Sequence, residues 1–419
     1  MSRIDDLIGL TCPEGICFEP IDSVVQRITT IRWSNVTEEA FQYIDLTSVD
    51  RNTHAITETQ IITNASAPSR AQQIVREGDV IFGTTRPTLK RCAVVPATYD
   101  GQIASTGYCV LRPKSNLILT NFLFHLLGTL DFSSYVEANE RGASYPAIPD
   151  SVVKNFPVPL PPLEVQREIV AILDTFTELE AELEAELEAR RRQYEYYRNA
   201  LLRLDGKSGI KWIDNLCQGG VEWKALGEIG VFIRGNGLQK SDLTESGVPA
   251  IHYGQIHTYY GTFASETRSF VNRELATKLR KAATGDLIIA TTSEDDAAVG
   301  KAVAWLGDHD AAVSGDAYIY RHTLEPKYMA YFFQSQQFRE QKQRYISGTK
   351  VRRISGDNLS KVKIPIPPLE VQHKIVNILD NFDALVNDLS IGLPAELVAR
   401  RKQYEYYRDR LLTFKDASA

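Results

Sequence analysis

Hydrophobic positions along the chain form two long stripes. In each stripe, apolar or aromatic residues recur every three or four positions apart from one step of seven, where Arg190 is the polar exception in the first stripe; this is the spacing of a coiled-coil seam. The first stripe comprises Ile169, Ile172, Phe176, Leu179, Leu183, Leu187, Tyr194, Tyr197 and Leu201. The second comprises Ile375, Ile378, Phe382, Leu385, Leu389, Leu393, Leu397, Tyr404, Tyr407 and Leu411. Because one chain carries both stripes, the pattern predicts two long helices that bury their seams against each other.

Prolines precede both predicted helices. The segments 157–162 and 365–368 contain too many prolines to be helix interior, so they mark the end of whatever comes before. The first helix contains three tandem Glu-Leu-Glu-Ala units at residues 178–189. One such unit adds about 6 Å of helix and a rotation of roughly 40°, so the seam survives a change in unit number. Gly392 and Pro394 lie in the corresponding zone of the second helix, where we expect a break or a kink, with a restart near Pro394.

The two helical segments belong to a duplication that spans nearly the whole chain. The run Pro-Pro-Leu-Glu-Val-Gln occurs at 161–166 and 367–372, an offset of 206, and Gln-Tyr-Glu-Tyr-Tyr-Arg occurs at 193–198 and 403–408, an offset of 210. The second copy therefore has four extra residues between these runs. Weaker matches precede them in each copy: Gly15–Ile21 with Gly220–Leu226, Gly78–Ile81 with Gly285–Ile288, and Gly142–Ile148 with Gly348–Ile354.

The resulting order, variable module then helical segment, twice, predicts a tandem repeat of mixed α/β (α+β) class. β-branched and aromatic runs such as Asp79–Gly83 and Ala317–Tyr320, with polar glycine-containing loops between them, indicate mixed modules. We expect two globular modules separated by two long antiparallel coiled-coil helices, with pseudo-twofold symmetry. The expected boundaries are 1–155 and 207–361 for the modules, and 156–206 and 362–419 for the helical spacers. A coil joining two chains is the alternative for an isolated acidic helix, but the duplication favours an intramolecular spacer.

Net charge argues at first against a nucleic-acid partner, because the chain carries −6 and phosphate-binding proteins usually have excess Lys and Arg. However, residues 163–189 hold nine acidic residues against one basic residue, a local charge of −8. The remainder of the chain therefore carries +2, and its modules are able to present basic faces.

The cysteines and the N-terminal segment indicate the cellular compartment in which we expect the protein. The five cysteines are odd in number and scattered, and the seven histidines lack metal-ligand spacing, so we expect a reducing environment without disulfides or a metal site. Residues 1–15 carry acids and lack an export signal, and no apolar run approaches the length of a membrane span. The sequence predicts a cytoplasmic protein with no membrane contact. The cysteines are Cys12, Cys17, Cys92, Cys109 and Cys217.

The repeated segments resemble the specificity subunit of Type I restriction-modification systems. In both copies a module ends in P-x-P-P-L-E-V-Q, followed by I-V-x-I-L-D, a Leu/Ala/Glu helix and A-R-R-x-Q-Y-E-Y-Y-R. The first copy of this pattern begins at Pro159 and the second at Pro365, and the similarity covers essentially all of the chain. The four-residue helix units are also similar to that family.

The resemblance implies a non-catalytic, sequence-specific DNA-recognition subunit. Each module would be a target-recognition domain for one half of a bipartite site in double-stranded DNA, and the paired helices would set the gap. The implied protein partners are two DNA adenine methyltransferase subunits and, in the full complex, two restriction subunits. Since DNA advances 3.4 Å per base pair, one helical unit would lengthen the gap by about one to two base pairs.

No catalytic or cofactor motif is found in the sequence. Residues 295–302 resemble a P-loop only at Gly300-Lys301, because the first glycine and the Ser/Thr are missing. No D/N-P-P-Y/F motif of an amino-methyltransferase and no dinucleotide-binding glycine pattern is present. We therefore expect no cofactor and no enzymatic activity. The alternatives are a nuclease or methylase in one chain, and a structural scaffold that holds two enzyme subunits without reading DNA.

Loops at matching positions of the repeat supply the candidate DNA contacts. Arg and Lys bind phosphates, and Arg, Lys, Asn, Gln, Ser and Thr bind base edges. The candidates in the first module are Thr84, Thr85, Arg86, Lys90, Arg91, Arg141, Ser144 and Tyr145. Those in the second are Arg234, Asn236, Lys240, Thr291, Thr292, Lys350, Arg352 and Arg353. A solvated surface role is an equal alternative for any single arginine. The tyrosines of the repeated Gln-Tyr-Glu-Tyr-Tyr-Arg runs are candidates for base stacking, but their helical spacing favours packing.

Overall fold

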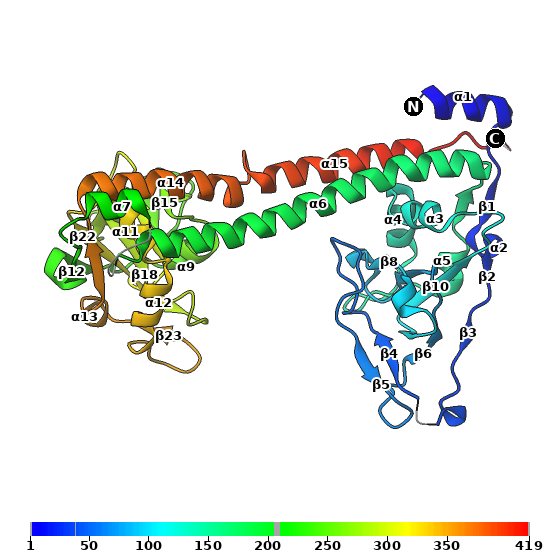
Figure 1. The fold of residues 1–419 in the computed structure, drawn as a ribbon, viewed down its shortest axis with the longest axis horizontal. Coiled ribbons are helices and arrows are strands. Elements are labelled where there is room, and N and C mark those ends of the chain that lie inside the picture. The colour runs from blue at the N-terminus through cyan, green and yellow to red at the C-terminus, as the bar shows by residue number, and fades with distance from the viewer. Residues whose placement is uncertain (1, 38, 205–209, 418–419) are drawn as a thin grey trace. The chain divides into compact units, whose positions relative to one another are not determined.

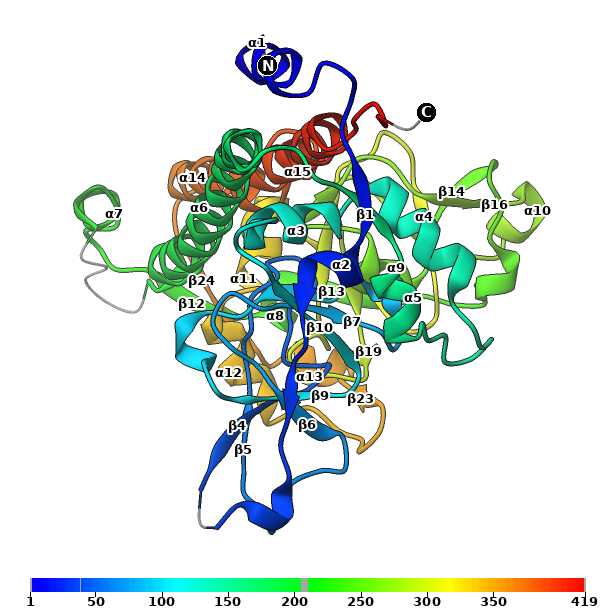
Figure 2. The ribbon, with the colours of Figure 1, turned by 90° about the vertical axis from the view of Figure 1, so that its right-hand side faces the viewer.

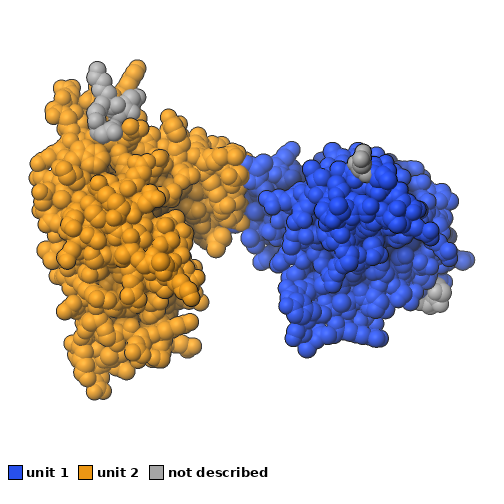
Figure 3. Space-filling view, turned by 90° about the horizontal axis from the view of Figure 1, so that it is seen from below, with its two compact units in different colours: residues 1–185, 395–419 blue, residues 186–394 orange. Residues whose placement is uncertain are grey.

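The computed structural model describes residues 2–37, 39–204 and 210–417. The chain forms two compact units: unit 1 comprises Met1–Ala185 and Ala395–Ala419, and unit 2 comprises Glu186–Pro394 (Figure 3). The expected boundary between residues 206 and 207 lies outside the described residues.

Unit 1 begins with one copy of the mixed α/β module. Its strands are β1 (Phe18–Pro20), β2 (Val25–Gln26), β3 (Thr29–Thr30), β4 (Phe41–Ile44), β5 (Gln60–Ile62), β6 (Ala71–Ile74), β7 (Val80–Gly83), β8 (Cys92–Val94), β9 (Ile103–Ser105), β10 (Tyr108–Pro113) and β11 (Pro157–Pro159). Its helices are α1 (Ser2–Thr11), α2 (Ile21–Val24), α3 (Thr120–Leu126), α4 (Leu130–Asn139) and α5 (Asp150–Lys154), with short 3-10 turns η1 (Trp33–Asn35), η2 (Pro87–Leu89) and η3 (Ala97–Tyr99).

Two sheets make up this module. The first has the order β2-β10-β7-β8 and is antiparallel. The second has the order β3-β6-β9-β4-β5, in which β4 and β9 are parallel. A separate pair, β1 with β11, joins the start of the module to its end. The second sheet lies at the end of unit 1 opposite the long helices (Figures 1 and 2).

Alternating side chains place β7 and β10 between two hydrophobic cores. Successive residues of a strand point to opposite faces of the sheet. Val80 and Phe82 of β7 therefore belong to the core beneath α3 and α4, while Ile81 points into the core between the sheets. Every residue of β7 is buried, which explains why this strand reads as a continuous apolar run.

Unit 2 contains the second copy. Its strands are β12 (Glu222–Ala225), β13 (Gly230–Arg234), β14 (Val248–Ile251), β15 (Phe263–Ala264), β16 (Ser269–Val271), β17 (Lys281–Ala282), β18 (Leu287–Ala290), β19 (Thr292–Ser293), β20 (Ala302–Trp305), β21 (Ala311–Val313), β22 (Ala317–His322), β23 (Arg352–Arg353) and β24 (Lys363–Ile366). Its helices include α7 (Lys211–Leu216), α8 (Leu226–Ile229), α9 (Tyr253–Thr258), α10 (Arg273–Ala276), α11 (Pro326–Phe332), α12 (Gln336–Gln343), α13 (Gly356–Leu359) and the 3-10 turn η4 (Lys240–Asp242).

The sheets of unit 2 repeat the plan of unit 1. One has the order β13-β22-β18-β20-β15, and the other has the order β16-β14-β21-β17, with β14 and β21 parallel. The pair β12 with β24 corresponds to β1 with β11. Leu287 and Ile289 of β18 face the core beneath α11, and Ile288 and Ala290 face the core between the sheets. The predicted strands at 79–83 and 317–320 are confirmed as β7 and β22.

Three long helices follow the modules: α6 (Leu163–Leu202), α14 (Leu369–Asn387) and α15 (Leu393–Leu411). The expected break in the second helical segment is confirmed, because α14 ends at Asn387 and α15 restarts at Leu393, one residue before Pro394. Gly392 is required at this break. A Cβ there would lie 2.4 Å from the Ala384 carbonyl oxygen and 2.7 Å from that of Leu385, so any other residue displaces the end of α14.

Each helical segment is fastened to its module by the glutamine of the Pro-Pro-Leu-Glu-Val-Gln run. Gln166 is fully buried; its Oε1 accepts from the Leu119 N–H, and its Nε2 donates to the Leu117 and Pro161 carbonyl oxygens. Gln372 makes two of these three bonds in unit 2: its Oε1 accepts from the Glu325 N–H, and its Nε2 donates to the Pro367 carbonyl oxygen. A buried amide that satisfies backbone groups on both sides gives the repeated motif a structural role.

Candidate nucleic-acid interface

In unit 1, the structure brings together the two loops that the repeat suggested. Thr85 and Arg141 both bridge to Ala147, so the segment after β7 lies against the segment after α4. The Arg86 N–H donates to the Pro146 carbonyl oxygen at 2.7 Å, and the Arg86 guanidinium lies over the Tyr145 ring, 4.5 Å from its centroid. The two predicted clusters therefore form one surface, which we call the unit 1 loop pair (84–91 with 141–147).

The backbone of the unit 1 loop pair is unusual. Arg86 and Lys90 both have φ of 51°, in the left-handed region, and they flank the 3-10 turn η2. Non-glycine residues rarely adopt this conformation, and they do so at a cost in stability that the surrounding structure must offset. Gly142 turns the other loop with φ of 102°, where a Cβ would lie 3.0 Å from the Tyr145 carbonyl oxygen.

The candidates in this loop pair differ in exposure. Thr84 is buried, and its hydroxyl donates to the Gly107 carbonyl oxygen, so it holds the loop rather than facing solvent. Lys90 lines a cavity against the helices, which is described below. The exposed candidates are Arg86, Lys90, Arg141, Ser144 and Tyr145, and the Tyr145 side chain is 70% exposed. Thr85 and Arg91 are partly buried.

Unit 2 has a matching loop pair (291–296 with 347–353). Thr292 pairs with Arg353 and Ser293 with Arg352 as β19 and β23. The Thr291 hydroxyl donates to the Asp316 carbonyl oxygen, as Thr84 donates to Gly107 in unit 1. The unit 2 loop pair lies on the side of its unit away from α14 (Figures 1 and 2).

Two of the candidate arginines of unit 2, Arg352 and Arg234, lie close to carboxylates. Arg352 Nε lies 2.8 Å from Asp296 Oδ1, and its Nη1 donates to the Gly348 carbonyl oxygen. Arg234 Nε donates to the Gly315 carbonyl oxygen at 2.9 Å, and its Nη2 lies 4.0 Å from Asp316 Oδ1. Arg353, Lys240 and Lys350 are exposed. The sequence patterns gave no sign of Asp296 or Asp316, because each contacts its arginine only through the fold.

Other groups of unit 2 are committed to the framework. Asn236 accepts from the Arg280 N–H and donates to the Lys278 carbonyl oxygen, so it braces a loop. Thr292 is 7% exposed, and His257 Nε2 contacts its carbonyl oxygen at 2.9 Å. Burial lowers the pKa of His257, against the opposing effect of that contact, and this favours the neutral ring.

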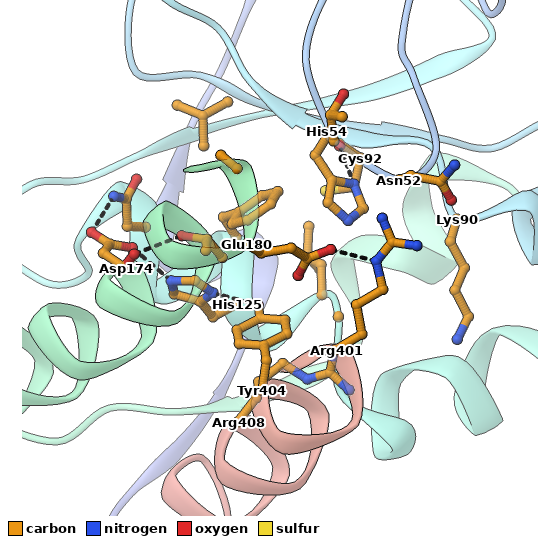
Figure 4. Close-up of a pocket in the computed structure, with 18 of the residues that line it drawn as sticks. Asn52, His54, Lys90, Cys92, His125, Asp174, Glu180, Arg401, Tyr404 and Arg408 are labelled. Atoms are coloured by element: carbon orange, nitrogen blue, oxygen red, sulfur yellow. Dashed lines mark hydrogen bonds and ion pairs between the residues drawn. The ribbon is translucent and has the colours of Figure 1, made fainter. Parts of the chain in front are cut away.

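A second cluster joins the module of unit 1 to its helices around a cavity of about 550 Å³ (Figure 4). His125 of α3 is 1% exposed; its Nε2 lies 2.8 Å from Asp174 Oδ1 on α6, and its Nδ1 lies 2.8 Å from Tyr404 Oη on α15. Asn121 Nδ2 donates to Asp174 Oδ2. Burial raises the pKa of Asp174, but the bonds from His125 and Asn121 and the charge of His125 outweigh it, so the pKa is lowered.

The helices of unit 1 pack in opposite directions. Phe176 stacks on Tyr407 with ring centroids 5.4 Å apart, and Arg401 forms ion pairs with both Glu180 and Glu184. Residue numbers increase along α6 where they decrease along α15, so the two helices are antiparallel. Within unit 2, Phe382 of α14 stacks on Tyr194 and Tyr197 of α6. Among the described residues, no group of three or more His, Cys, Asp or Glu side chains could hold a metal ion.

Comparison with known proteins decides the family. The model described as the Type I restriction modification DNA specificity domain matches the chain twice, at residues 42–189 and 219–399. The two matches fall on the two copies of the repeat and cover well over half of the chain. The chain belongs to this family.

Two relatives of the Type I specificity family are about a third identical to the chain over the aligned residues. A putative type I restriction enzyme specificity subunit of Haemophilus influenzae is 31% identical over 312 residues, or 70% of this chain and 72% of that protein. The EcoR124I/EcoR124II specificity subunit of Escherichia coli is 32% identical over 311 residues, or 71% and 72% respectively. The resemblance of the repeated motifs is therefore confirmed, and the chain is a non-catalytic DNA-specificity subunit.

A solved structure supports the same assignment of fold. A chain from work on complex assembly and conformational transition of the type I R-M system matches with a TM-score of 0.66 and 28% identity. The match covers 95% of this chain and 97% of the other. The expected tandem architecture of two mixed domains with long helices is thus confirmed for the specificity subunit.

The helix-packing residues of the specificity subunit fall into three groups. Most are buried or partly buried: Ile169, Ile172, Phe176, Leu183, Leu187, Ile375, Ile378, Phe382, Leu385 and Leu397. Leu179 is 45% exposed, because the four-residue units drift around the helix and Glu180 takes the seam position. The prediction for Leu389 is wrong: it follows the end of α14 and is 78% exposed, since the chain leaves the helix before reaching it. None of the described helices is long and apolar enough to cross a membrane.

Proposed function

We propose that each module reads one half of a bipartite site in double-stranded DNA, through the unit 1 loop pair and the unit 2 loop pair. The observation that carries this proposal is their equivalence. In each unit, a segment leaving a central buried strand lies against a glycine-turned segment just before the helical spacer, and basic side chains are exposed there. Membership of the DNA specificity family supports DNA as the ligand.

We propose that the helical segments set the gap between half-sites and dock the partner subunits. The partners would be two DNA adenine methyltransferase subunits and, in the full complex, two restriction subunits. The work on type I complex assembly from which a similar chain comes supports association with such subunits. In this proposal the recognition domains are residues 1–155 and 207–361, and the spacers are residues 156–206 and 362–419.

The repeated units suit α6 to changes in length. Arg401 binds Glu180 and Glu184, which are equivalent positions of adjacent Glu-Leu-Glu-Ala units. Removing residues 182–185 brings the next unit into register, so Arg401 again meets two glutamates four residues apart. The deletion therefore shortens the helix by about 6 Å without breaking this contact.

Mapping methylated adenines in cells that carry the complete system tests the proposal. Deleting residues 182–185 is expected to keep both half-sites and to shorten the gap by about one to two base pairs. Replacing residues 1–155 with another module should change one half-site only. Altered half-sites with an unchanged gap would contradict the assignment of reading to the modules and spacing to the helices.

Salt dependence provides a second test. Binding of the complex with methyltransferase subunits to its duplex should weaken linearly on a log-log plot against salt, with a slope set by several phosphate contacts. A slope near zero would instead support a scaffold that does not read DNA.

A further inference from the structure

One arginine on the unit 1 loop pair is held in place yet leaves its hydrogen-bonding edges free. The Arg86 guanidinium lies over the Tyr145 ring at 4.5 Å, and both side chains are exposed. Among the residues that the structure describes, no carboxylate lies within 4.0 Å of the guanidinium. A cation over an aromatic face uses the flat side of the guanidinium, so its N–H donors point outward into solvent.

The backbone also fixes the direction of this side chain. Arg86 is in the left-handed conformation, its N–H donates to the Pro146 carbonyl oxygen, and its carbonyl oxygen accepts from the Leu89 N–H. The opposite loop is fastened by the bridges from Thr85 and Arg141 to Ala147. Strain kept in an exposed loop by so many bonds is typical of a functional position.

The other candidate arginines, in the two loop pairs and at the end of β13, differ in this respect. Arg352 is bound by Asp296 and by the Gly348 carbonyl oxygen, and Arg234 is bound by the Gly315 carbonyl oxygen close to Asp316. Their donors are used within the protein. Arg141 and Arg353 are exposed, but neither has an aromatic partner among the described residues, so their side chains are not fixed in the same way.

Resting on the proposed DNA-reading function, we propose that Arg86, positioned by Tyr145, reads a guanine in the half-site bound by the module of unit 1. A planar fork of donors matches O6 and N7 of guanine in the major groove, and this bidentate contact distinguishes guanine from the other bases. A phosphate contact needs only charge, which Arg141 supplies without a fixed direction. Holding the fork before binding reduces the rotamer freedom lost on contact.

The test uses the complete enzyme with its methyltransferase subunits. Methylated-adenine mapping first gives the wild-type site, and competition binding then compares duplexes that differ at each position of the half-sites. Arg86→Gln is expected to lower discrimination at one guanine by roughly five- to 150-fold, in one half-site only, and to favour adenine there. Arg141→Gln, the matched control, is expected to weaken binding to all of these duplexes equally.

Two tyrosine variants keep the inference testable if Arg86→Gln does not fold. Tyr145→Phe retains the aromatic face and should retain guanine discrimination, whereas Tyr145→Leu should lose it. A wild-type site with no guanine in either half, unchanged discrimination in Arg86→Gln, or equal discrimination in the two tyrosine variants would overturn the inference. The proposed DNA reading would survive each of these results, because it fails only if the wild-type complex shows no salt-dependent, bipartite recognition.

Discussion

The two modules join their helices through the same carboxylate position but with different chemistry. The Ile-Leu-Asp run places Asp174 on α6 in unit 1 and Asp380 on α14 in unit 2, at the offset of the repeat. Each aspartate accepts hydrogen bonds from two side chains of the helix above it. In unit 1 the donors are His125 and Asn121, and in unit 2 they are Tyr331 and Lys327.

The difference shows what the duplication preserves. His125 and Tyr331 occupy the same repeat position, as do Asn121 and Lys327, so donor number is kept while donor identity is not. In unit 2, Lys327 forms an ion pair with Asp380, with Nζ 2.7 Å from Oδ2. In unit 1, His125 also hydrogen-bonds to Tyr404. Tyr194, the repeat equivalent of Tyr404, instead donates a hydrogen bond to Asp383. The requirement is a carboxylate whose hydrogen bonds are satisfied where the module meets its long helix, a contact that we call the helix joint. More than one set of donors meets this requirement.

A second pair of equivalent contacts, both aspartate–arginine ion pairs, differs in burial rather than in chemistry. We expect replacement of the aspartate in these pairs to have the largest effect on stability. Asp79 binds Arg112 within the first sheet of unit 1, and Asp286 binds Arg321 in unit 2. Both aspartates are buried, but the Arg112 side chain is 20% exposed and that of Arg321 is 53% exposed. Asp79→Ala should therefore destabilise its unit by about 3–5 kcal/mol, because a cation is left in a largely dry site.

Asp286→Ala is the matched variant for this prediction. Its effect should be smaller, since water solvates Arg321 once its partner is gone. Hydrogen exchange measured by mass spectrometry reports the opening free energy of each unit separately, which a single melting temperature of a two-unit chain cannot do. Equal losses in the two variants would show that arginine burial does not decide the cost.

The helix joint should show the next largest effect. Asp174→Ala removes the acceptor of His125 and Asn121 and is expected to cost about 2–3 kcal/mol in unit 1, because a 1% exposed imidazole loses its charged partner. Asp174→Asn, which keeps the side-chain size and one acceptor, should cost less. Exchange protection of α3 and of residues 163–185 measures both, and Asp380→Ala provides the unit 2 equivalent.

The same joint predicts a dependence on pH. The pKa of Asp174 is lowered in the fold, by the donors His125 on α3 and Asn121, with Tyr404 of α15 behind the imidazole. A lowered pKa means that its contribution is full above the ordinary value of 3.8 and is lost as pH falls through the lower folded value. Below pH 4, wild type should thus lose part of its advantage over Asp174→Asn; an advantage constant with pH would contradict this.

Much of this architecture could be predicted because it depends on local pattern. The seam spacing predicted the helices, and Gly392 with Pro394 predicted the break between α14 and α15. Repeat alignment predicted which loops correspond, and within each unit those loops do lie together. These features need only periodicity, turn chemistry and the equivalence of two copies.

The remaining features depend on contacts between segments far apart in the chain. His125 meets Asp174 across 49 residues and Tyr404 across 279, so no local pattern marks it. No residue type marks the left-handed backbone at Arg86 and Lys90, and the Arg86 N–H is bonded to Pro146, 60 residues away. Leu389 has the right spacing for the seam, but the end of α14 removes it from the helix.

The smallest expected effect concerns the seam itself, which is charged in unit 1 and apolar in unit 2. Arg401 binds Glu180 and Glu184 in unit 1, whereas Leu187 and Val386 are buried in the helical core of unit 2. Arg401→Met should lower exchange protection of α15 by at most about 1 kcal/mol, because the Arg401 side chain is 34% exposed and such pairs are partly solvated. This loss of protection should become smaller as salt is raised from about 0.05 to about 1 M, because salt screens interactions between exposed charges.

Arg191→Met is the control for the seam prediction. Arg191 is the repeat equivalent of Arg401 and is exposed on α6, so its replacement should leave protection unchanged at every salt concentration. If the two variants behave alike, or if the Arg401→Met difference does not respond to salt, the glutamates of the four-residue units do not hold α15. The glutamates would then serve only helix propensity and solubility. Keeping the Arg401 contact after a unit is removed would not explain why α6 tolerates a change in length.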